Sequence, residues 1–326
     1  MRVFQNANYP IMEWRRRAYI ITAVLFAMTL GAMIMNVAQI GSWLKYGVDF
    51  TGGTQVQLEF QRPVTVEQIR QAAAAGGHDD WEITSFGSDR EYLVRMQGFS
   101  GDIGNTSGER VASALSSRFT TGRDLRVVRT EAMSAKVGDE LQLRALWAIL
   151  LSLGATLLYL WYRFEWRFGL AAIAATFHDI LITLGILAVM RSEISLGTVA
   201  AFLTIVGYSL NDTIVVFDRI RENLAKPRHG VSYFEILTRS VNETLPRTVL
   251  TGGSTIGCLL ALLAFGGPVI FDFSLVLLLG IVIGTFSSIF VATPVLYYIE
   301  MKWPHKAPRK ETAARSTSRS RAAANT

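Results

Sequence analysis

Asn211 and Asp212 place two polar side chains inside a long apolar run, residues 195–216. Insertion scales give a cost of roughly 2.5–3.5 kcal/mol for an aspartate at the centre of a bilayer helix, so such a residue indicates a functional site. Hydrocarbon disfavours the charged form of a carboxylate, whereas a nearby guanidinium favours it. A small helix movement can therefore switch its protonation, and the chemistry to expect is the coupling of an ion to a conformational change.

The guanidinium that could face Asp212 belongs to Arg247. It follows Pro246, and proline is favoured in the first turn of a helix, so we expect the next apolar helix to begin here. One connection joins the two helices, which puts Asp212 and Arg247 at similar depths on neighbouring antiparallel helices. Tyr208 and Asn211 lie four and seven residues after Thr204 and share a helix face beside Asp212. These side chains are typical of a path for water or ions.

A second polar pair, His178 and Asp179, lies in the apolar run 168–190. At 1.5 Å per residue it is roughly 15 Å from the start of that helix, near the middle of a bilayer. Polar groups in membrane helices also hold helices together by hydrogen bonds, and this structural role is the one we expect for the pair. The same alternative stays open for Asp212, and Arg247 could equally be an anchor whose charged end reaches the membrane surface.

Six apolar runs must position these residues. They span residues 18–38, 142–162, 168–190, 195–216, 248–267 and 273–299 of the 326-residue chain. Each approaches the roughly 20 residues that cross hydrocarbon, which predicts a polytopic α-helical membrane protein with six transmembrane helices, the last five within residues 142–303. Lys and Arg gather in the tail 1–17, after the second run, in the segment 218–246 and in the tail 304–326. By the positive-inside rule, these parts and both termini are cytoplasmic.

The segment 218–246 is expected to be an amphipathic connector on the membrane surface, and the basic tail 304–326 is expected to be disordered. The net charge of +6 follows from this topology and does not indicate nucleic-acid binding. Small residues recur every four positions in the last two runs, which predicts close helix packing within the chain or against another subunit. They are Gly253 and Gly257, and Gly280, Gly284 and Ser288.

Residues 39–141, between the first two helices, are the only stretch long enough for a separate water-soluble domain. Their patterns predict strands at 53–61, 81–86, 90–96 and 125–130 and helices at 65–75 and 107–119. The order β-α-β-β-α-β predicts a small α+β ferredoxin-like domain, which the topology places outside the cytoplasm. His78 has no second His or Cys beside it, so we expect no metal site, and hydrolase or nucleotide motifs are absent from the sequence. Neither enzymatic activity nor a cofactor is expected.

The segment Gly47-Val48-Asp49-Phe50-Thr51-Gly52-Gly53-Thr54 resembles a signature that SecD and SecF proteins share. The pair 178–179, the run 207–223, Arg247 and the segment 265–268 then follow in the order of the SecF family. Over residues 10–303 the chain thus resembles this family, a half-size group of the resistance-nodulation-division transporter superfamily. The resemblance implies a heterodimer with SecD in the bacterial inner (cytoplasmic) membrane. With the SecYEG translocon and YajC, the pair would use the proton or sodium motive force in late steps of preprotein export.

The resemblance also assigns residues to an ion pathway. Asp212 takes the place of the family's carboxylate on the fourth helix, and Arg247 that of the arginine thought to pair with it. The other implied residues are Asn211 and Thr213 beside this pair, His178, Asp179 and Tyr208 in the membrane part, and Asp49, Gly52 and Gly53 in the signature.

Two other functions compete with this one. A proton-driven exporter of small molecules from the same superfamily would need outer domains much larger than residues 39–141 to build a substrate cavity. A structural assembly factor without ion coupling would use the polar residues only for packing. Replacing Asp212 with Asn separates the last alternative from ion coupling, because the amide keeps the packing and removes the titratable charge.

Overall fold

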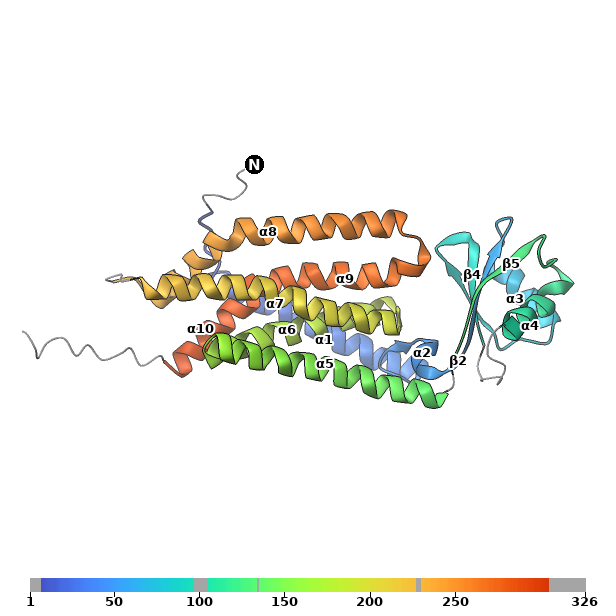
Figure 1. Ribbon diagram of the computed structural model, residues 1–326, viewed down its shortest axis with the longest axis horizontal. Helices are drawn as coiled ribbons and strands as arrows, with labels where there is room; N and C mark the ends of the chain where they lie inside the picture. The colour runs from blue at the N-terminus through green and yellow to red at the C-terminus, as the bar shows by residue number, and fades with distance from the viewer. Residues whose placement is uncertain (1–6, 97–104, 134, 227–229, 305–326) are drawn as a thin grey trace, which may run out of the picture.

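Two parts follow one another along the long axis of the computed structural model (Figure 1). The structure describes residues 7–96, 105–133, 135–226 and 230–304. A bundle of long helices occupies one end, and a small domain of strands and short helices occupies the other. The chain contributes one helix to the bundle, forms the small domain, and then returns to the bundle.

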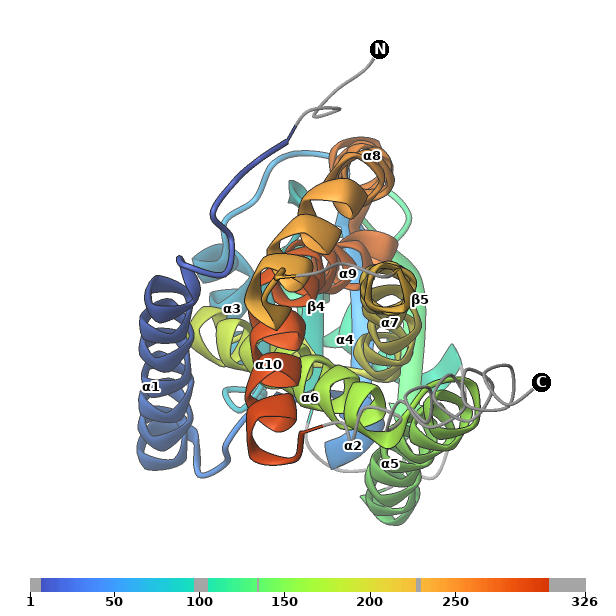
Figure 2. The same cartoon turned by 90° about the vertical axis from the view of Figure 1, so that its left-hand side faces the viewer.

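Among the described residues, six helical stretches are long and apolar enough to cross a membrane, as predicted. They are α1 Arg15–Ile40, α5 Ala135–Arg163, α6 Trp166–Met190, α7 Leu196–Ala225, α8 Tyr233–Phe265 and, as the sixth, α9 Pro268–Ser287 continued by the π-helical turn η2 Ser288–Ala292 and by α10 Thr293–Lys302. Seen along the bundle, α1, α5 and α8 lie towards the outside (Figure 2). The helices α6, α7 and α9 are the most buried, so Asp179 and Asp212 both lie on inner helices.

Small residues let the inner helices approach each other closely. A Cβ atom at Gly284 would lie 3.1 Å from the Cβ of Ser209, and one at Gly280 would overlap Ile205, so α9 packs directly on α7. The close packing predicted at these two glycines is therefore made within the chain. A Cβ atom at Gly253 or Gly257 would have no described neighbour within 4 Å, and both glycines are exposed on α8.

The connector predicted at 218–246 is wrong. Residues 218–225 continue α7 and residues 233–246 continue α8, so these parts of the segment lengthen two membrane helices. The two extensions are held together by charge, since Arg219 Nε donates to Glu243 Oε2 at 2.6 Å. The apolar sides of the two extensions are buried in the core of the bundle, and this burial stabilises the continued helices.

The predicted start of α8 at Arg247 is also wrong. Pro246 lies inside this helix and not in its first turn. A proline inside a helix removes one backbone hydrogen bond and commonly bends the helix, and the ribbon of α8 changes direction towards its N-terminal end (Figure 1). Arg247 therefore belongs to the interior of α8.

The described part of the N-terminal tail packs on the bundle. Tyr9 N donates to Asn242 Oδ1 at 2.8 Å, and Asn242 Nδ2 donates to Tyr9 O at 2.9 Å. Ile11 and Met12, which follow, are buried in the core of the bundle. Of the tail 304–326, residues 305–326 lie outside the described residues, so its expected disorder stays a prediction.

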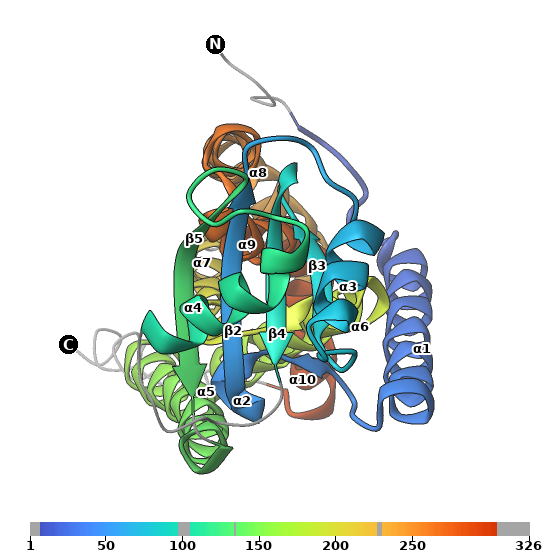
Figure 3. The same ribbon diagram turned by 90° about the vertical axis from the view of Figure 1, so that its right-hand side faces the viewer.

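The small domain has the predicted order of elements. They are β2 Gly53–Phe60, α3 Val66–Ala75, β3 Glu82–Phe86, β4 Ser88–Met96, α4 Asn105–Ala114 with the turn η1 Leu115–Ser117, and β5 Leu125–Met133. The sheet order is β3-β4-β2-β5 and every neighbouring pair is antiparallel. Both helices lie on one face of the sheet (Figure 3), and a separate apolar core that includes Val56, Leu58 and Ile69 fills the space between. The opposite face of the sheet looks towards the bundle (Figure 1).

Three short elements between the bundle and the domain are not among the predicted ones. The strand β1 Lys45–Tyr46 pairs in parallel with β6 Glu193–Ile194, which lies in the turn between α6 and α7. The helix α2 Val48–Thr51 follows β1 and leads directly into β2. These elements fix the region where the domain meets the membrane helices.

Candidate functional site in the helix bundle

Asp212 lies on α7, and only 2% of its surface is exposed. Its carboxylate oxygen Oδ2 is buried and has no hydrogen-bond partner among the described residues. Two residues of α8 act on the carboxylate, Arg247 through its charge and Thr251 through its hydroxyl group. A buried polar atom without a partner is costly and rare in folded proteins, which indicates a role other than stability.

Arg247 is close to Asp212 but is not in direct contact with it. Its side chain is exposed on α8, and among the described residues no ion pair within 4.0 Å joins the two side chains. Asn211 is also exposed. Asn211 on α7 and Arg247 on α8 are thus left exposed by the described residues, while the carboxylate of Asp212 is inside.

Tyr208 connects α7 to α8 one turn before Asp212. Its hydroxyl donates to Thr251 O at 3.1 Å and to Thr255 Oγ1 at 3.1 Å. Thr251 is thus shared between the phenol of Tyr208 and the surroundings of Asp212. Of the row of polar side chains predicted on this face of α7, Tyr208 contacts a hydroxyl group of α8, whereas Thr204 and Asn211 are exposed.

Three threonine hydroxyls are also buried without a partner among the described residues. They belong to Thr213 on α7, Thr248 on α8 and Thr285 on α9. Thr285 lies against Gly252, where a Cβ would come within 3.1 Å of its hydroxyl, and Gly252 is one helical turn from Thr248. The helices α7, α8 and α9 pack on one another, and each carries buried polar atoms that have no partner among the described residues. Buried polar groups of this kind usually bind water, which suits a path for protons or small cations.

Asp179 forms a second polar centre with the opposite property, because its carboxylate is fully buried and fully paired. Oδ2 accepts hydrogen bonds from Ser209 Oγ at 2.6 Å and from Ser287 Oγ at 2.8 Å, and Oδ1 lies 3.0 Å from His178 Nδ1. The other ring nitrogen of His178 lies 3.4 Å from Thr22 Oγ1. The centre thus joins α1, α6, α7 and α9, as expected of a structural hydrogen-bond network.

Ser209 and Ser287 are functional neighbours that the sequence reasoning missed. Ser209 lies three residues before Asp212, and Ser287 directly precedes Ser288 in the row of small residues. Their spacing contained the signal, since a small polar residue on the packed face of a membrane helix commonly bonds across to another helix. Serine is so frequent in such helices that the partner could not be chosen without the fold.

The signature residues Asp49, Gly52 and Gly53 are not part of either polar centre. They lie between the bundle and the small domain, where Asp49 Oδ2 accepts a hydrogen bond from Leu196 N at 2.9 Å. Gly52 and Gly53 have φ values of +71° and +117°, a region that favours glycine. A Cβ at Gly53 would also come within 2.8 Å of Met96 O, so both glycines are required by the backbone.

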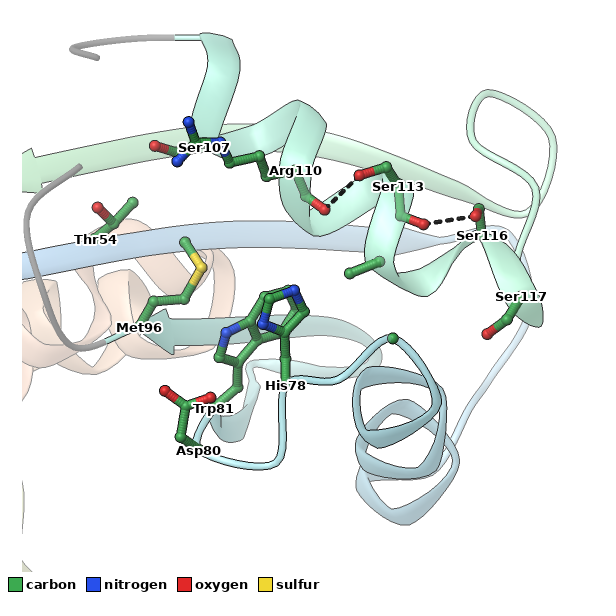
Figure 4. A pocket seen from close by; sticks show the side chains of 12 residues that line it. Thr54, His78, Asp80, Trp81, Met96, Ser107, Arg110, Ser113, Ser116 and Ser117 are labelled. Atoms are coloured by element: carbon green, nitrogen blue, oxygen red, sulfur yellow. Dashed lines mark hydrogen bonds between the residues drawn. The ribbon is translucent and has the colours of Figure 1, made fainter. Parts of the chain in front are cut away.

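The small domain contains a hollow of about 600 Å³ between α4 and the turn before β3 (Figure 4). His78 stacks on Trp81 in this hollow with 4.4 Å between the ring centroids. Ser113 and Ser116 on the opposite wall donate to backbone oxygens of α4. Groups of three or more His, Cys, Asp or Glu that could hold a metal ion are absent from the described residues.

Comparison with known proteins agrees with this arrangement. The family model described as "Protein export membrane protein SecD/SecF, C-terminal" matches residues 114–302, and the one described as "SecD/SecF GG Motif" matches residues 38–64. The membrane helices and the signature therefore define a protein-export membrane protein of the SecD/SecF class.

Individual relatives narrow this class. The protein translocase subunit SecF of Gemmatimonas aurantiaca is 43% identical over 98% of this chain and 97% of its own length, and that of Vibrio alginolyticus is 41% identical over 91% of each. The chain belongs to the SecF family and is a multi-pass membrane protein. The crystal structure of SecDF, a translocon-associated membrane protein from Thermus thermophilus, matches 92% of this chain with a TM-score of 0.79 and 36% identity. The chain spans 40% of that SecDF chain.

Proposed function

We propose that this protein works with a SecD partner in the bacterial inner (cytoplasmic) membrane and uses the proton or sodium motive force to drive late steps of preprotein export. The observation that carries the proposal is the carboxylate of Asp212, which is buried on α7 near Arg247 and Thr251 of α8 and has an oxygen atom without a partner among the described residues. Such a group can take up a proton or a small cation without first breaking an existing hydrogen bond. The unpaired hydroxyl of Thr213 beside it is a further polar atom of that path.

Arg247 is the proposed counter-charge of Asp212. The two side chains are not in contact within 4.0 Å in the conformation described, so a small approach of α8 to α7 would form the ion pair. Protonation of Asp212 removes the attraction between the two groups and favours separation. An ion that enters at Asp212 would thus bias the relative position of two helices, which is the minimum that ion coupling requires.

A SecD partner is proposed for the uncovered surface of α7 and α8. Arg247 of α8 and Asn211 of α7 are exposed among the described residues, and so are Gly253 and Gly257 on α8, which leave room for a close helix. An exposed guanidinium at membrane depth is unfavourable in lipid, and close contacts at small residues are typical of helix pairs in membranes. The SecYEG translocon, YajC and the preprotein are further proposed partners, which rest on membership of the SecF family.

The proposed topology puts both termini in the cytoplasm and the small domain, which we read as ferredoxin-like, outside it. Support comes from the end of the bundle opposite the domain, where Arg163, Arg167, Arg219 and Lys226 gather at the ends of α5, α6 and α7. The strand order β3-β4-β2-β5 with two helices on one face supports the ferredoxin-like assignment. The predicted boundaries of tails and domain stay part of this proposal.

The variant Asp212→Asn tests the proposal, with Asp218→Asn on the same helix as the matched control. Both changes remove one negative charge, but Asp218 is exposed and lies 3.9 Å from Arg163. We expect Asp212→Asn to form the complex with SecD and to lose gradient-dependent export in membrane vesicles, and Asp218→Asn to export like the wild type. Undiminished export by Asp212→Asn would contradict ion coupling and leave a structural assembly factor as the function.

A further inference from the structure

The segment from Gly47 to Gly53 contacts the bundle and the small domain within seven residues. Phe50 is 2% exposed and belongs to the apolar core of the bundle. Gly53, three residues later, begins β2, which lies between β4 and β5 in the sheet of the domain. The chain segment between the two cores is therefore too short to act as a flexible linker.

Two hydrogen bonds attach this segment to the beginning of α7. Asp49 Oδ2 accepts from Leu196 N at 2.9 Å, and Gly47 N donates to Ile194 O at 2.8 Å. Leu196 is the first residue of α7, whose N-terminus is also closed by a capping box of Ser195 and Thr198. A carboxylate is favoured at this place because the first N–H groups of a helix are unpaired and carry partial positive charge.

A third contact attaches the segment to α5. Gln142 Nε2 donates to Phe50 O at 3.0 Å, and a Cβ at Gly138 would lie 2.5 Å from the same oxygen. The backbones of α5 and α2 therefore touch. Since α5 and α7 both hold the segment, it has little freedom to rotate against the bundle.

Four charged residues surround this attachment and cross from the domain to the bundle. Lys45 Nζ lies 3.0 Å from Glu82 of β3 and 3.2 Å from Glu193 of β6, and Arg95 of β4 lies 3.6 Å from each of the same two carboxylates. We call these four residues the junction ion network. It links the edge of the sheet to the turn that enters α7.

We propose that Asp49 is a positioning residue that fastens the beginning of α7 to the central strands of the small domain, so that a shift of α7 moves the domain directly. The inference rests on the proposed function, because it is ion binding at Asp212 that would shift α7. Asp212 lies sixteen residues after Leu196 on one uninterrupted helix, roughly 24 Å at 1.5 Å per residue. The contacts of Asp49 therefore point to transmission through the fourth membrane helix.

The first experiment compares Asp49→Ala with Asp49→Asn in a Cys258→Ala background, because Cys258 is the one cysteine of the chain and is exposed. Asparagine keeps an oxygen that can accept from Leu196 N, and alanine does not. We expect Asp49→Ala to lower gradient-dependent export about fivefold, the factor that loss of one helix-capping hydrogen bond commonly gives. Export without a gradient and the amount of complex with SecD should not change, and Asp49→Asn should restore most of the loss.

The second experiment replaces the lost hydrogen bond by a covalent one. Lys45 and Glu193 are direct partners in the pairing of β1 with β6, so Lys45→Cys with Glu193→Cys can form a disulfide across the joint. In the Asp49→Ala protein we expect oxidation to restore gradient-dependent export and reduction to abolish the gain. In the protein that keeps Asp49, oxidised export should equal or exceed reduced export.

Three results would overturn the proposal: wild-type export by Asp49→Ala, no recovery on oxidation, or loss of export on oxidation when Asp49 is present. If Asp49→Ala does not accumulate in the membrane, the effect of oxidation on export by the double-cysteine protein that keeps Asp49 tests the proposal. Asp212→Asn, measured in parallel, distinguishes a failure of ion coupling at Asp212 from a failure of the attachment proposed for Asp49. If Asp212→Asn exports normally, the proposed ion coupling is refuted. If Asp212→Asn loses gradient-dependent export while Asp49→Ala exports normally, only the proposed role of Asp49 is refuted.

Discussion

Replacing Asp179 with Ala should destabilise the bundle without acting on ion coupling directly. The carboxylate makes three contacts, with Ser209, Ser287 and His178, at 2.6, 2.8 and 3.0 Å. Two of these contacts, with Ser209 and Ser287, join different helices, and interhelical hydrogen bonds in membranes average about 0.6 kcal/mol, which gives about 1 kcal/mol as the lower limit. Hydrogen bonds to charged groups in water-soluble proteins contribute about 1.5–3 kcal/mol each, which gives about 3–6 kcal/mol for the two as the upper limit. Ser287 can keep its alternative acceptor, Gly284 O at 3.1 Å, so we expect a loss of about 2–4 kcal/mol.

The assay is thermal unfolding of the purified protein in detergent. The measured quantity is the fraction of protein that stays monodisperse at each temperature. A loss of this size should lower the midpoint by several degrees, since about 1 kcal/mol corresponds to roughly 2–4 °C in a chain of comparable size. Asp212→Asn is the matched comparison, and its midpoint should be unchanged or higher, because it removes a buried carboxylate oxygen that has no partner among the described residues. An unchanged midpoint for Asp179→Ala combined with lost gradient-dependent export would refute the reasoning and make Asp179 part of the ion path.

Three further predictions test the packing, the tail and the joint. Gly185→Ala, whose Cβ would overlap α1, should cost about 1–3 kcal/mol in thermal unfolding, whereas Gly31→Ala, with open space around it, should be neutral or slightly stabilising. Asn242→Ala removes both hydrogen bonds to Tyr9 and should make the N-terminal tail more accessible to protease; unchanged cleavage would count against the contact. Partial burial alone would raise the pKa of Glu82, but the hydrogen bond and charge of Lys45 and the charge of Arg95 lower it. The contribution of these Glu82 interactions to the free energy of unfolding is less than about 1 kcal/mol, because the group is half exposed. The contribution is present above the ordinary glutamate pKa of about 4.3 and is lost as the pH falls through the lowered pKa of Glu82. Hydrogen exchange of β3 should therefore increase below about pH 4 in the wild type and less in Glu82→Gln.

The membrane helices could be predicted from the sequence because the signal is local. A run of about 20 apolar residues without charge has few alternatives, and all six runs correspond to observed helices. The prediction failed at 218–246, where charged residues on a helix surface were taken for the end of the helix. Charge on one side of a helix does not end it when the other side is buried, and here Ile220 and Leu237 are fully buried.

The candidate site was predictable only in part, for a physical reason. A buried carboxylate is conspicuous in an apolar run, so Asp179 and Asp212 could both be found. What distinguishes them is whether each has partners, and those partners are far away in the chain: Ser209 lies 30 residues and Ser287 lies 108 residues from Asp179. The contact between Asp49 and Leu196 spans 147 residues and involves a backbone N–H, which no side-chain pattern can indicate.

The distance between Asp179 and Ser287 also sets an order for the biogenesis of the protein. The helix α6 with its aspartate is synthesised before α9, because Ser287 comes 108 residues after Asp179. At roughly 5–20 residues per second, this leaves Asp179 without one of its bonding partners for about 5–20 s. During that interval the half-made chain carries a carboxylate with an incomplete set of partners. The bundle can therefore close only after its sixth membrane helix arrives, which makes the last part of the chain the step that commits the protein to its fold.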